Sequence, residues 1–597
     1  MIEGGVPAGR HDAQVESEWR SRSWWGWGYE AGQLGDSDIA RLRSTAGALL
    51  GLDGTVAEVP AVGGLRLAEP RCMPPETLAG QAATDDFARA LHAYGCSYRD
   101  VVRSLSGVLE HPPDFVFFPR SEADVARAMD WCSSESVALI PYGGGSSVVG
   151  GIEPDVGEEY RGTVSLDLAY MNAVQDIDRM SCSARIEGGC LGPELERGLG
   201  KEELTLRHFP QSFSRSTLGG WIATRAGGHF ATGETHIEDF VESVRMVAPA
   251  GLIETRRLPA SGAGPSPDRL VAGSEGILGV ITSAWVRVMG RPVFRARCSY
   301  AFPTFEDGTE ALRLLVQSGL RPSNCRVVDA AEALINQAGD GSHAVMLVAF
   351  ESAGYPVASL ARAASELLEG AGGTSEADWQ LIEGRPGAVG ASSRGGDGRS
   401  GGGGHGGGDK EGGRGRSAGG GAPGTSGTSG RWRDSFIRAP YLRDAMVRLG
   451  ALVETFETAV TWDRFSRLHA SVTEAVEQEL KACGAEPAVV TCRITHAYSD
   501  GPAPYFTVVA RAPRGREVEC WDRVKYAASH AVSAGGGTIT HHHAVGRVHS
   551  AHYGEEAPRL FLAGVRSVKA VLDPEGILNP GVLLGPSALE PSVTGSR

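Results

Sequence analysis

Residues 141 to 151, "PYGGGSSVVGG", place three consecutive glycines directly after a predicted strand, "VALIPY". Consecutive glycines let backbone N–H groups converge on an anion, because no Cβ stands in the way. The segment is not a Rossmann fingerprint, since Val148 stands where the third glycine would follow Gly143 and Gly145. It also lacks the Gly-Lys-Ser/Thr of a P-loop. Alone, the run is equally well explained as a tight turn.

Two further loops of small residues strengthen the ligand hypothesis. They are "PQSFSRSTLGGWIATRAGG" at 210–228 and "GSEGILGVIT" at 273–282, and each lies beside a predicted strand. We call 141–151, 210–228 and 273–282 the first, second and third glycine loops. Three such loops in one chain suggest one long ligand that crosses several of them, and a dinucleotide with two phosphates is the natural candidate.

The remaining pattern predicts alternating helices and strands from about residue 114 onward. Before residue 110 the chain is partly helical, with an aromatic cluster, "WWGWGYE", that we expect to be ordinary packing. Residues 392–430 are rich in glycine and serine, which predicts a disordered insertion. Strands are predicted at 114–119, 137–142, 163–168, 183–189, 279–289, 488–498 and 504–512, and helices at 121–136 (capped by Ser121), 441–456 and 462–484.

Composition excludes several classes of protein. A chain of 597 residues is expected to form two or three domains, and a net charge of −15 argues against a nucleic-acid partner. The ten cysteines include no CxxC pair, which fits reduced thiols rather than zinc or redox motifs. The N-terminal residues lack the apolar region of a secretory signal, and no apolar run is long enough to predict a transmembrane helix.

Taken together, the motifs resemble those of a known family. The order P-x-G-G-G-[ST]-S, P-x-S-x(4)-T-x-G-G-W-x-x-T-R-A-x-G and G-S-E-G-x-L-G-V-I-T is similar to the vanillyl-alcohol-oxidase type of FAD-binding flavoproteins. Within that superfamily the chain resembles the alkyldihydroxyacetonephosphate synthases, which form the ether bond of ether lipids. "WGWGY", "YLRD", "ETFETAVTWDR", "TCRITHAY", "PYF" and "THHHAVG" match in the same order. Gln211, where these synthases usually carry Asp, and the ending "GILNPGVLLG" depart from the pattern.

The resemblance implies an α+β fold with a two-subdomain FAD-binding domain of the PCMH type and an α+β cap, or substrate, domain. The domains predicted on this basis are a partly helical N-terminal region at 1–109, the FAD-binding domain at 110–293, the cap and C-terminal catalytic region at 294–585, interrupted by the 392–430 insertion, and a tail at 586–597.

By the same resemblance, the glycine loops hold FAD. Members that bind FAD covalently often carry a histidine just after the glycine run, where this chain has Ser146, so non-covalent FAD is expected. The predicted cofactor-binding residues are Pro141, Tyr142, Gly143, Gly144, Gly145, Ser146, Ser147, Pro210, Gln211, Ser212, Phe213, Ser214, Arg215, Ser216, Ala223, Thr224, Arg225, Ala226, Glu275, Gly276, Ile277, Leu278, Gly279, Val280 and Ile281.

Three consecutive histidines, His541, His542 and His543, form what we call the histidine triplet. The segment "GGTITHHHAVG" has strand character, which predicts His541 and His543 on one face and His542 on the other. The triplet could be a catalytic cluster, a metal site or an idle strand. No His-Glu-x-x-His motif or cysteine cluster supplies further ligands, so no metal is predicted. Imidazole suits proton transfer near neutrality, which favours a catalytic cluster.

The resemblance assigns further roles by position. It implies that Tyr505 is a proton donor and that Arg443 binds substrate, and a guanidinium suits a phosphate ester. Arg326 is a second, weaker substrate-binding candidate, and Arg493 stays open between structure and substrate. The implied substrates are acyl-dihydroxyacetone phosphate and a fatty alcohol, exchanged without net redox. The alternative is an FAD-dependent dehydrogenase of a 2-hydroxy acid such as D-lactate or glycolate.

Location and assembly rest on the resemblance alone. It implies a peroxisomal enzyme, although "RLRSTAGAL" at 41–49 only half resembles an N-terminal peroxisomal signal and the chain ends in "GSR". Otherwise a cytoplasmic location is expected. A homodimer and peripheral membrane association are also expected.

Overall fold

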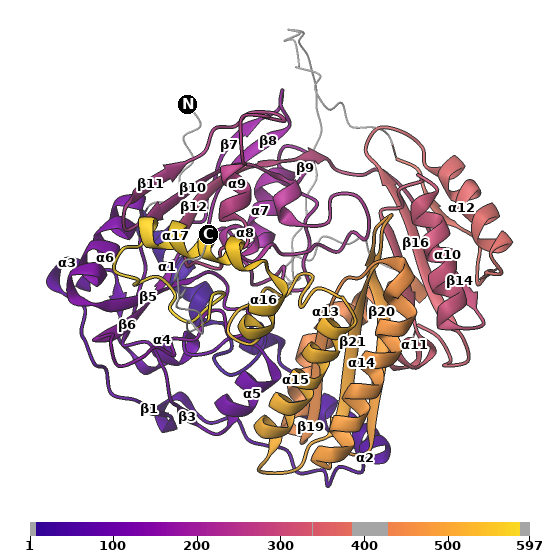
Figure 1. Cartoon of the computed structure of the whole chain (residues 1–597), viewed down its shortest axis with the longest axis horizontal. Helices are drawn as coiled ribbons and strands as arrows, with labels where there is room; N and C mark the ends of the chain where they lie inside the picture. Colours follow the sequence, from indigo (N-terminus) through magenta and orange to yellow (C-terminus); the bar gives the residue numbers. More distant parts are fainter. Residues whose placement is uncertain (1–7, 337, 385–427, 586–597) are drawn as a thin grey trace, which may run out of the picture.

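The computed structural model describes residues 8–336, 338–384 and 428–585. Two sheets build the half of the molecule that carries the glycine loops (Figure 1). The first sheet has the order β2 (Ala82–Ala83), β4 (Phe115–Phe117), β6 (Gly162–Asp167), β5 (Val137–Tyr142), with β4, β6 and β5 parallel. The second, antiparallel, has the order β11 (Gly251–Glu254), β10 (Val241–Ala248), β12 (Val280–Arg287), β8 (Ser183–Glu187), β7 (Val174–Asp178).

Helix α6 (Glu122–Glu135) joins these two sheets, since it packs against both β5 and β10. Its start follows the sequence prediction, because the Ser121 side chain accepts a hydrogen bond from the backbone N–H of Asp124. The first glycine loop continues directly from the end of β5, the strand against which α6 packs. The predicted strands that became β4, β5, β6, β8 and β12 are confirmed.

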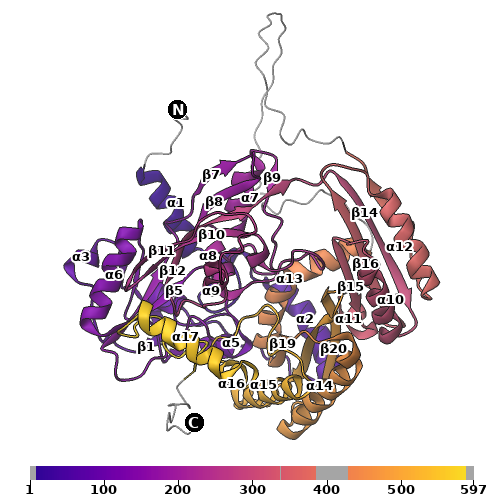
Figure 2. The same ribbon diagram turned by 45° about the horizontal axis from the view of Figure 1, so that its top comes forward.

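The other half is one large antiparallel sheet covered by helices (Figure 2). Its order is β17 (Thr374–Ser375), β14 (Phe294–Phe302), β16 (Ala344–Ser352), β15 (Asn324–Val328), β20 (Ala488–Ala497), β21 (Pro502–Arg511), β19 (Ala451–Glu457), with β18 (Gln380–Ile382) also pairing with β14. The helices are α10 (Phe305–Gln317), α11 (Ala330–Ile335), α12 (Ala358–Gly370), α13 (Thr428–Arg448), α14 (Trp462–Cys483) and α15 (Glu517–Ala534).

Further helices and strands complete the fold of the described residues. Among them are α1 (Ala8–Arg20), α2 (Asp36–Leu50), α3 (Glu76–Ala79), α4 (Asp86–Leu91), α5 (Tyr98–Leu105), the β1 (Arg66–Leu67) and β3 (Val108–Leu109) pair, α7 (Gly192–Gly200), β9 (Leu204–Thr205), α8 (Leu218–Thr224), α9 (Pro267–Val271), β13 (Met289–Gly290), α16 (Ser550–Glu556) and α17 (Arg559–Leu572). The chain returns to the first half before α16, where the N–H of Val545 donates to Glu275 Oε1 at 2.9 Å, and after α17 the N–H of Leu139 in β5 donates to Ile577 O at 2.8 Å. Within the described residues, no helix is both long and apolar enough to cross a membrane.

Three sequence-based expectations were wrong in part. The helix predicted at 441–456 ends at Arg448, and 451–457 forms β19, because Gly450 takes a left-handed φ of +87° that stops the helix. The strand predicted around the histidine triplet is an irregular loop. The insertion predicted at 392–430 lies outside the described residues up to 427, but 428–430 begin α13.

Candidate active site

The three glycine loops converge on one place. The N–H of Glu275 in the third loop donates to Ala223 O in the second at 2.8 Å. The guanidinium of Arg215 in the second loop donates to Gly144 O in the first at 3.1 Å. A β carbon on Gly276 would lie 3.0 Å from the ring of Pro141. The prediction that one ligand crosses several loops is therefore consistent with their packing.

The three consecutive glycines of the first loop, Gly143 to Gly145, leave no room for side chains. A β carbon on Gly144 would collide with the carbonyl of Arg215, and one on Gly143 with the hydroxyl of Thr217. Gly145 has a φ of +69°, a left-handed conformation that other residues rarely adopt. Such a loop exposes backbone N–H groups at close range, as a pyrophosphate requires.

Some buried polar atoms around the loops have no hydrogen-bond partner in the part of the chain that the structure describes. Both ring nitrogens of His208 are buried without a hydrogen-bond partner among the described residues, next to Gly228. The Oδ1 of Asn579 is likewise unpartnered, although its Nδ2 donates to Glu275 O and Gly151 O. These features fit a polar dinucleotide. Arg225, which was also predicted to bind the cofactor, gives no such support, because its side chain is half-exposed and forms an ion pair with Glu238.

The histidine triplet is held by one buried carboxylate. Glu457, the last residue of β19, accepts hydrogen bonds from the backbone N–H groups of His541, His542 and His543 at 2.6, 3.0 and 2.9 Å. It also accepts one from the hydroxyl of Thr540 at 2.8 Å. Converging N–H groups of this kind form an anion-binding concavity. The backbone therefore wraps around Glu457 instead of joining a sheet, which is why the predicted strand is absent.

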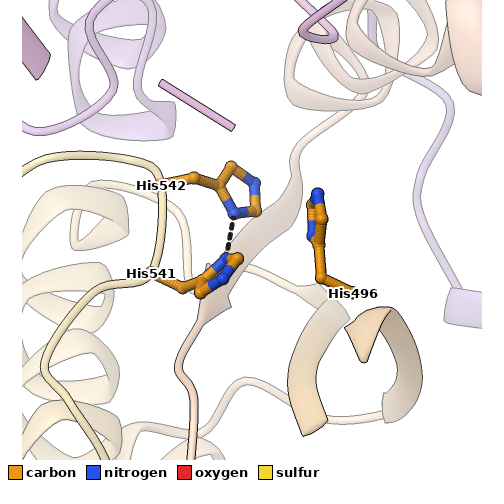
Figure 3. Close-up of side chains that lie close together, drawn as sticks. All are labelled: His496, His541 and His542. Atoms are coloured by element: carbon orange, nitrogen blue, oxygen red, sulfur yellow. Dashed lines mark hydrogen bonds between the residues drawn. The ribbon is translucent and has the colours of Figure 1, made fainter. Parts of the chain in front are cut away.

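The rings of the triplet do not alternate as a strand would require. The Nδ1 atoms of His541 and His542 lie 3.0 Å apart and share a hydrogen bond, and His496 of β20 packs beside both rings (Figure 3). His496 is anchored by its Nε2, which lies 2.9 Å from Gly228 O in the second glycine loop. A β carbon on Gly227 would lie 3.0 Å from the Cβ of His542. The triplet and the predicted flavin loop are therefore in contact.

Tyr505 of β21 lies against the same cluster. Its ring is stacked on that of His542, with centroids 6.2 Å apart and planes 19° apart, and meets the ring of His543 edge-on at 5.7 Å. The guanidinium carbon of Arg493 lies 3.9 Å from the centroid of Tyr505. Arg493 also forms a buried ion pair with Glu332. The structure thus brings together Tyr505 and all three histidines.

Burial sets the protonation of the cluster. It lowers the pKa of His542 to about 3 and that of His543 to about 4, while the neighbouring Glu457 opposes this effect. Burial also raises the pKa of Tyr505, against the attraction of Arg493. For Glu457, burial favours the protonated form, but the surrounding histidines and the N–H of His542 hold its pKa well below the usual range. Near neutrality the site holds neutral imidazoles, a neutral phenol and a carboxylate.

The two arginines predicted to bind substrate lie in different surroundings. Arg326 of β15 is fully buried and donates to His229 O at 2.7 Å, and burial together with Arg493 lowers its pKa to about 9. Arg443 of α13 donates to Cys96 O at 2.6 Å and to its neighbour Asp444. These contacts place Arg443 beside the first glycine loop, because the thiol of Cys96 donates to Gly145 O. Its substrate role stays a prediction.

Among the residues that the structure describes, two groups of side chains could hold a metal ion. They are His496, His541 and His542, and Glu457, His542 and His543. Several of their ligand atoms are already engaged, since His541 uses Nδ1 for His542 and Nε2 for Tyr498, while Glu457 accepts the backbone N–H groups of the triplet. A metal would have to break this network, so the expectation of no metal stays a prediction.

Sequence reasoning missed three residues of this site. Glu457 and His496 lie within the quoted segments "ETFETAVTWDR" and "TCRITHAY", but neither received a role, and Tyr498 in the second segment was also passed over. A signal was available for His496 and Tyr498, because both stand at the end of the strand predicted at 488–498. None was available for Glu457, because it follows a segment that was predicted to be a helix.

Comparisons with known families cover both halves of the chain. The family described as "FAD binding domain" matches residues 113–256. That described as "FAD linked oxidases, C-terminal domain" matches residues 291–400 and 424–583. The second match skips 401–423, within the predicted insertion.

Comparison with individual proteins shows that the chain is similar to alkyldihydroxyacetonephosphate synthases over most of its length. An alkyldihydroxyacetonephosphate synthase of Dictyostelium discoideum is 30% identical over 521 residues, which cover 85% of this chain and 79% of the relative. A solved alkyldihydroxyacetonephosphate synthase is 25% identical, covers 94% of this chain and 99% of its own, and has a TM-score of 0.72. A mitochondrial D-lactate dehydrogenase [cytochrome] of Arabidopsis thaliana is 31% identical, over only 37% of this chain and 38% of the relative.

Proposed function

The chain belongs to the alkyldihydroxyacetonephosphate synthase family of FAD-binding flavoproteins, and on this premise we propose that it exchanges the acyl chain of acyl-dihydroxyacetone phosphate for a long-chain alcohol. The observation that carries the proposal is the contact between His542 and Gly227, because it sets a proton-transfer cluster directly against a loop that fits FAD. The D-lactate dehydrogenase relative matches just over a third of the chain, which makes the dehydrogenase the weaker alternative.

The glycine loops supply the cofactor site. Residues 141–147, 210–216, 223–226 and 275–281 would hold FAD, with Gly143 and Gly144 giving its pyrophosphate close access to the backbone. When bound, FAD supplies an electron-accepting ring system next to which the substrate carbon is activated. The protein must supply the proton transfers and the anchoring of the phosphate.

The histidines and Tyr505 are suited to the proton transfers. The C1 hydrogen of the substrate is acidic because C1 is next to a ketone, and a base must remove it and later return a proton. A buried histidine whose pKa is lowered is neutral near pH 7, so His542 can accept that proton. Tyr505, whose pKa is raised, stays protonated and can donate to the departing carboxylate. No net oxidation is needed.

Buried guanidinium groups favour an anionic substrate. Arg326 and Arg493 lie on neighbouring strands β15 and β20, and burial together with the charge of Arg493 lowers the pKa of Arg326 to about 9. Glu332 already balances Arg493. A substrate phosphate would bring negative charge to this pair of guanidinium groups, and a planar guanidinium can bind two of its oxygens at once. We therefore assign the phosphate to Arg326 first and keep Arg443 as the second candidate.

Direct assay separates the proposed function from its alternative. Purified flavoprotein is supplied with acyl-dihydroxyacetone phosphate and hexadecanol, and separately with D-lactate and a dye that accepts electrons. We expect ether product and free fatty acid in the first assay and no dye reduction in the second. Dye reduction without ether product would establish the dehydrogenase instead. A homodimer, membrane association and a peroxisomal location are further implications of the family that stay predictions.

A further inference from the structure

A chain of hydrogen bonds leads away from the reacting side of the site. Tyr498, just beyond the end of β20, has its phenol oxygen 2.8 Å from His541 Nε2 and 2.9 Å from the hydroxyl of Thr235. His541 in turn shares its Nδ1 with His542 Nδ1 at 3.0 Å, as Figure 3 shows. Tyr498, His541 and His542 are therefore linked side chain to side chain. We call them the relay.

The outer end of the relay lies at a surface cavity. This cavity measures about 760 Å³, and its lining includes Tyr498 together with the exposed residues Asp500, Gly536, Glu555 and Glu556. His541 is almost completely buried, with 5% of its side chain exposed, whereas Tyr498 is only half-buried. Tyr498 therefore both lines the cavity and contacts a buried imidazole.

The two histidines of the relay are fixed in place. The carbonyl of His541 faces the Nε2 of His236 at 2.8 Å, and the backbone N–H groups of His541 and His542 are held by Glu457. His496, though nearby, is bound to Gly228 O and Thr495 through its two ring nitrogens. Only His541 among these neighbours therefore connects His542 with Tyr498.

We propose that Tyr498 and His541 pass protons between His542 and the water of this cavity. The inference rests on the proposed function, which requires a proton to leave C1 and another to return. It adds that these protons are exchanged with solvent along a defined route. Tyr498 acts through His541 and does not touch the substrate, so it is a positioning residue of the reaction and not a catalytic one.

The proton balance of the relay closes without a further reactant. When His542 Nε2 takes the C1 proton, the proton on His542 Nδ1 moves to His541 Nδ1. The proton on His541 Nε2 then moves to the oxygen of Tyr498, whose own hydroxyl proton leaves to water. One proton enters and one leaves, and each ring ends as the other neutral tautomer. Running the steps backward returns a proton to C1 and restores the starting tautomers.

Deuterium at C1 of the substrate reports on this route independently of rate. With wild-type protein, we expect the ether product to lose deuterium to water. Tyr498→Phe keeps the ring but removes the relaying hydroxyl, so the deuteron stays near His542 and the product should retain label several-fold more often. Turnover should fall about tenfold, less than the 10²- to 10⁴-fold typical of a direct general acid or base.

Two further variants make the test specific. Tyr300→Phe removes a buried phenol that lies 2.8 Å from the hydroxyl of Ser365 in the other half of the sheet, and it should leave label loss unchanged. Ser533→Trp places a bulky ring in the cavity that Tyr498 lines, leaves the three side chains of the relay unchanged in sequence, and should raise label retention as Tyr498→Phe does. If Tyr498→Phe does not fold, Ser533→Trp becomes the decisive variant.

Each result either supports or overturns the relay. Higher retention in Tyr498→Phe and Ser533→Trp but not in Tyr300→Phe supports it. Complete retention by the wild type, or equal retention in all four proteins, overturns it while leaving the proposed function intact, because ether product is still formed. If the wild type forms no ether product, the proposed function itself fails, and the relay fails with it.

Discussion

Tyr505 lies directly opposite Glu457 across the antiparallel pair of β19 and β21. Directly opposed residues share a face of the sheet and keep their Cβ atoms within about 4.5–5.5 Å of each other. Because Glu457 also binds the backbone N–H groups of the histidine triplet, one pair of strands sets the position of the phenol relative to the three imidazoles. The catalytic geometry therefore depends on a residue that need not touch the substrate.

Replacing Glu457 with glutamine tests this dependence. The amide nitrogen cannot accept a hydrogen bond, so at least one N–H group of the triplet loses its partner, at a cost of about 1–3 kcal/mol in unfolding free energy. We expect Glu457→Gln to retain FAD but to lose most of its turnover per bound flavin. Flavin absorbance, urea unfolding and ether formation measure the three quantities.

The matched control for this variant is Glu477→Gln, which removes the same charge from the exposed face of α14. It should change neither stability nor turnover. If Glu457→Gln turned over at the wild-type rate, the carboxylate would not be needed to position the histidines.

The sequence predicts the architecture well where local signals agree with the fold. Ser121 caps α6 as expected, and the alternation of 488–498 and 504–512 became β20 and β21. The prediction of a helix at 441–456 was wrong beyond Arg448. A periodic apolar pattern cannot show that Gly450 ends the helix, or that 451–457 joins a sheet by pairing with a strand distant in the sequence.

The candidate site is predicted only in part for a related reason. Tyr505 was identified by resemblance and the triplet from its run of imidazoles, and the structure brings them together. The loop conformation of the triplet was not predictable, because it depends on the carboxylate of Glu457. This carboxylate accepts a hydrogen bond from the backbone N–H of His541, 84 residues away along the chain. Contacts of this kind leave no trace in local periodicity.

The two arginine candidates can be separated by substitution with lysine. Lysine keeps the charge but loses the planar, two-pronged donor, so the variant of the true phosphate-binding residue should bind substrate more weakly. We expect Arg326→Lys to raise KM for acyl-dihydroxyacetone phosphate about tenfold, which corresponds to about 1.4 kcal/mol. Arg443→Lys should mainly lower thermal stability, because Arg443 holds Cys96 and Asp444. The opposite pattern would place the phosphate beside α13.

Stability should fall in mild acid. The pKa values of His542 and His543 are lowered from 6.5 to about 3 and about 4, so below pH 6.5 the unfolded chain binds protons that the folded chain does not. Each such histidine lowers the unfolding free energy by about 1.4 kcal/mol per pH unit between pH 6.5 and about 4. Below pH 4.5, protonation of Glu457 in the unfolded chain acts in the same direction.

Urea unfolding across this pH range measures the slope. In His543→Gln, the slope of the unfolding free energy against pH should be smaller by the contribution of one proton. A slope identical to that of the wild type would show that His543 is protonated equally in the folded and unfolded states.

The first glycine loop should determine flavin binding. A β carbon on Gly144 collides with the carbonyl of Arg215, so Gly144→Val should distort the loop and abolish FAD binding. Gly354→Val, at a glycine with open space around it, is the matched control and should bind FAD normally. Acid precipitation of the wild type should release all the flavin, because Ser146 offers no histidyl link. Flavin that stays with the precipitated chain would contradict non-covalent binding.

The most direct test of the whole account is the turnover of His542→Ala per bound flavin, measured as ether product from acyl-dihydroxyacetone phosphate and hexadecanol. His542 contacts both the flavin loop at Gly227 and the ring of Tyr505, and a direct general acid or base contributes about 10²- to 10⁴-fold in rate. We predict a folded, flavin-replete protein whose turnover is at least about a hundredfold below that of the wild type. A flavin-replete His542→Ala with near wild-type turnover would contradict the account.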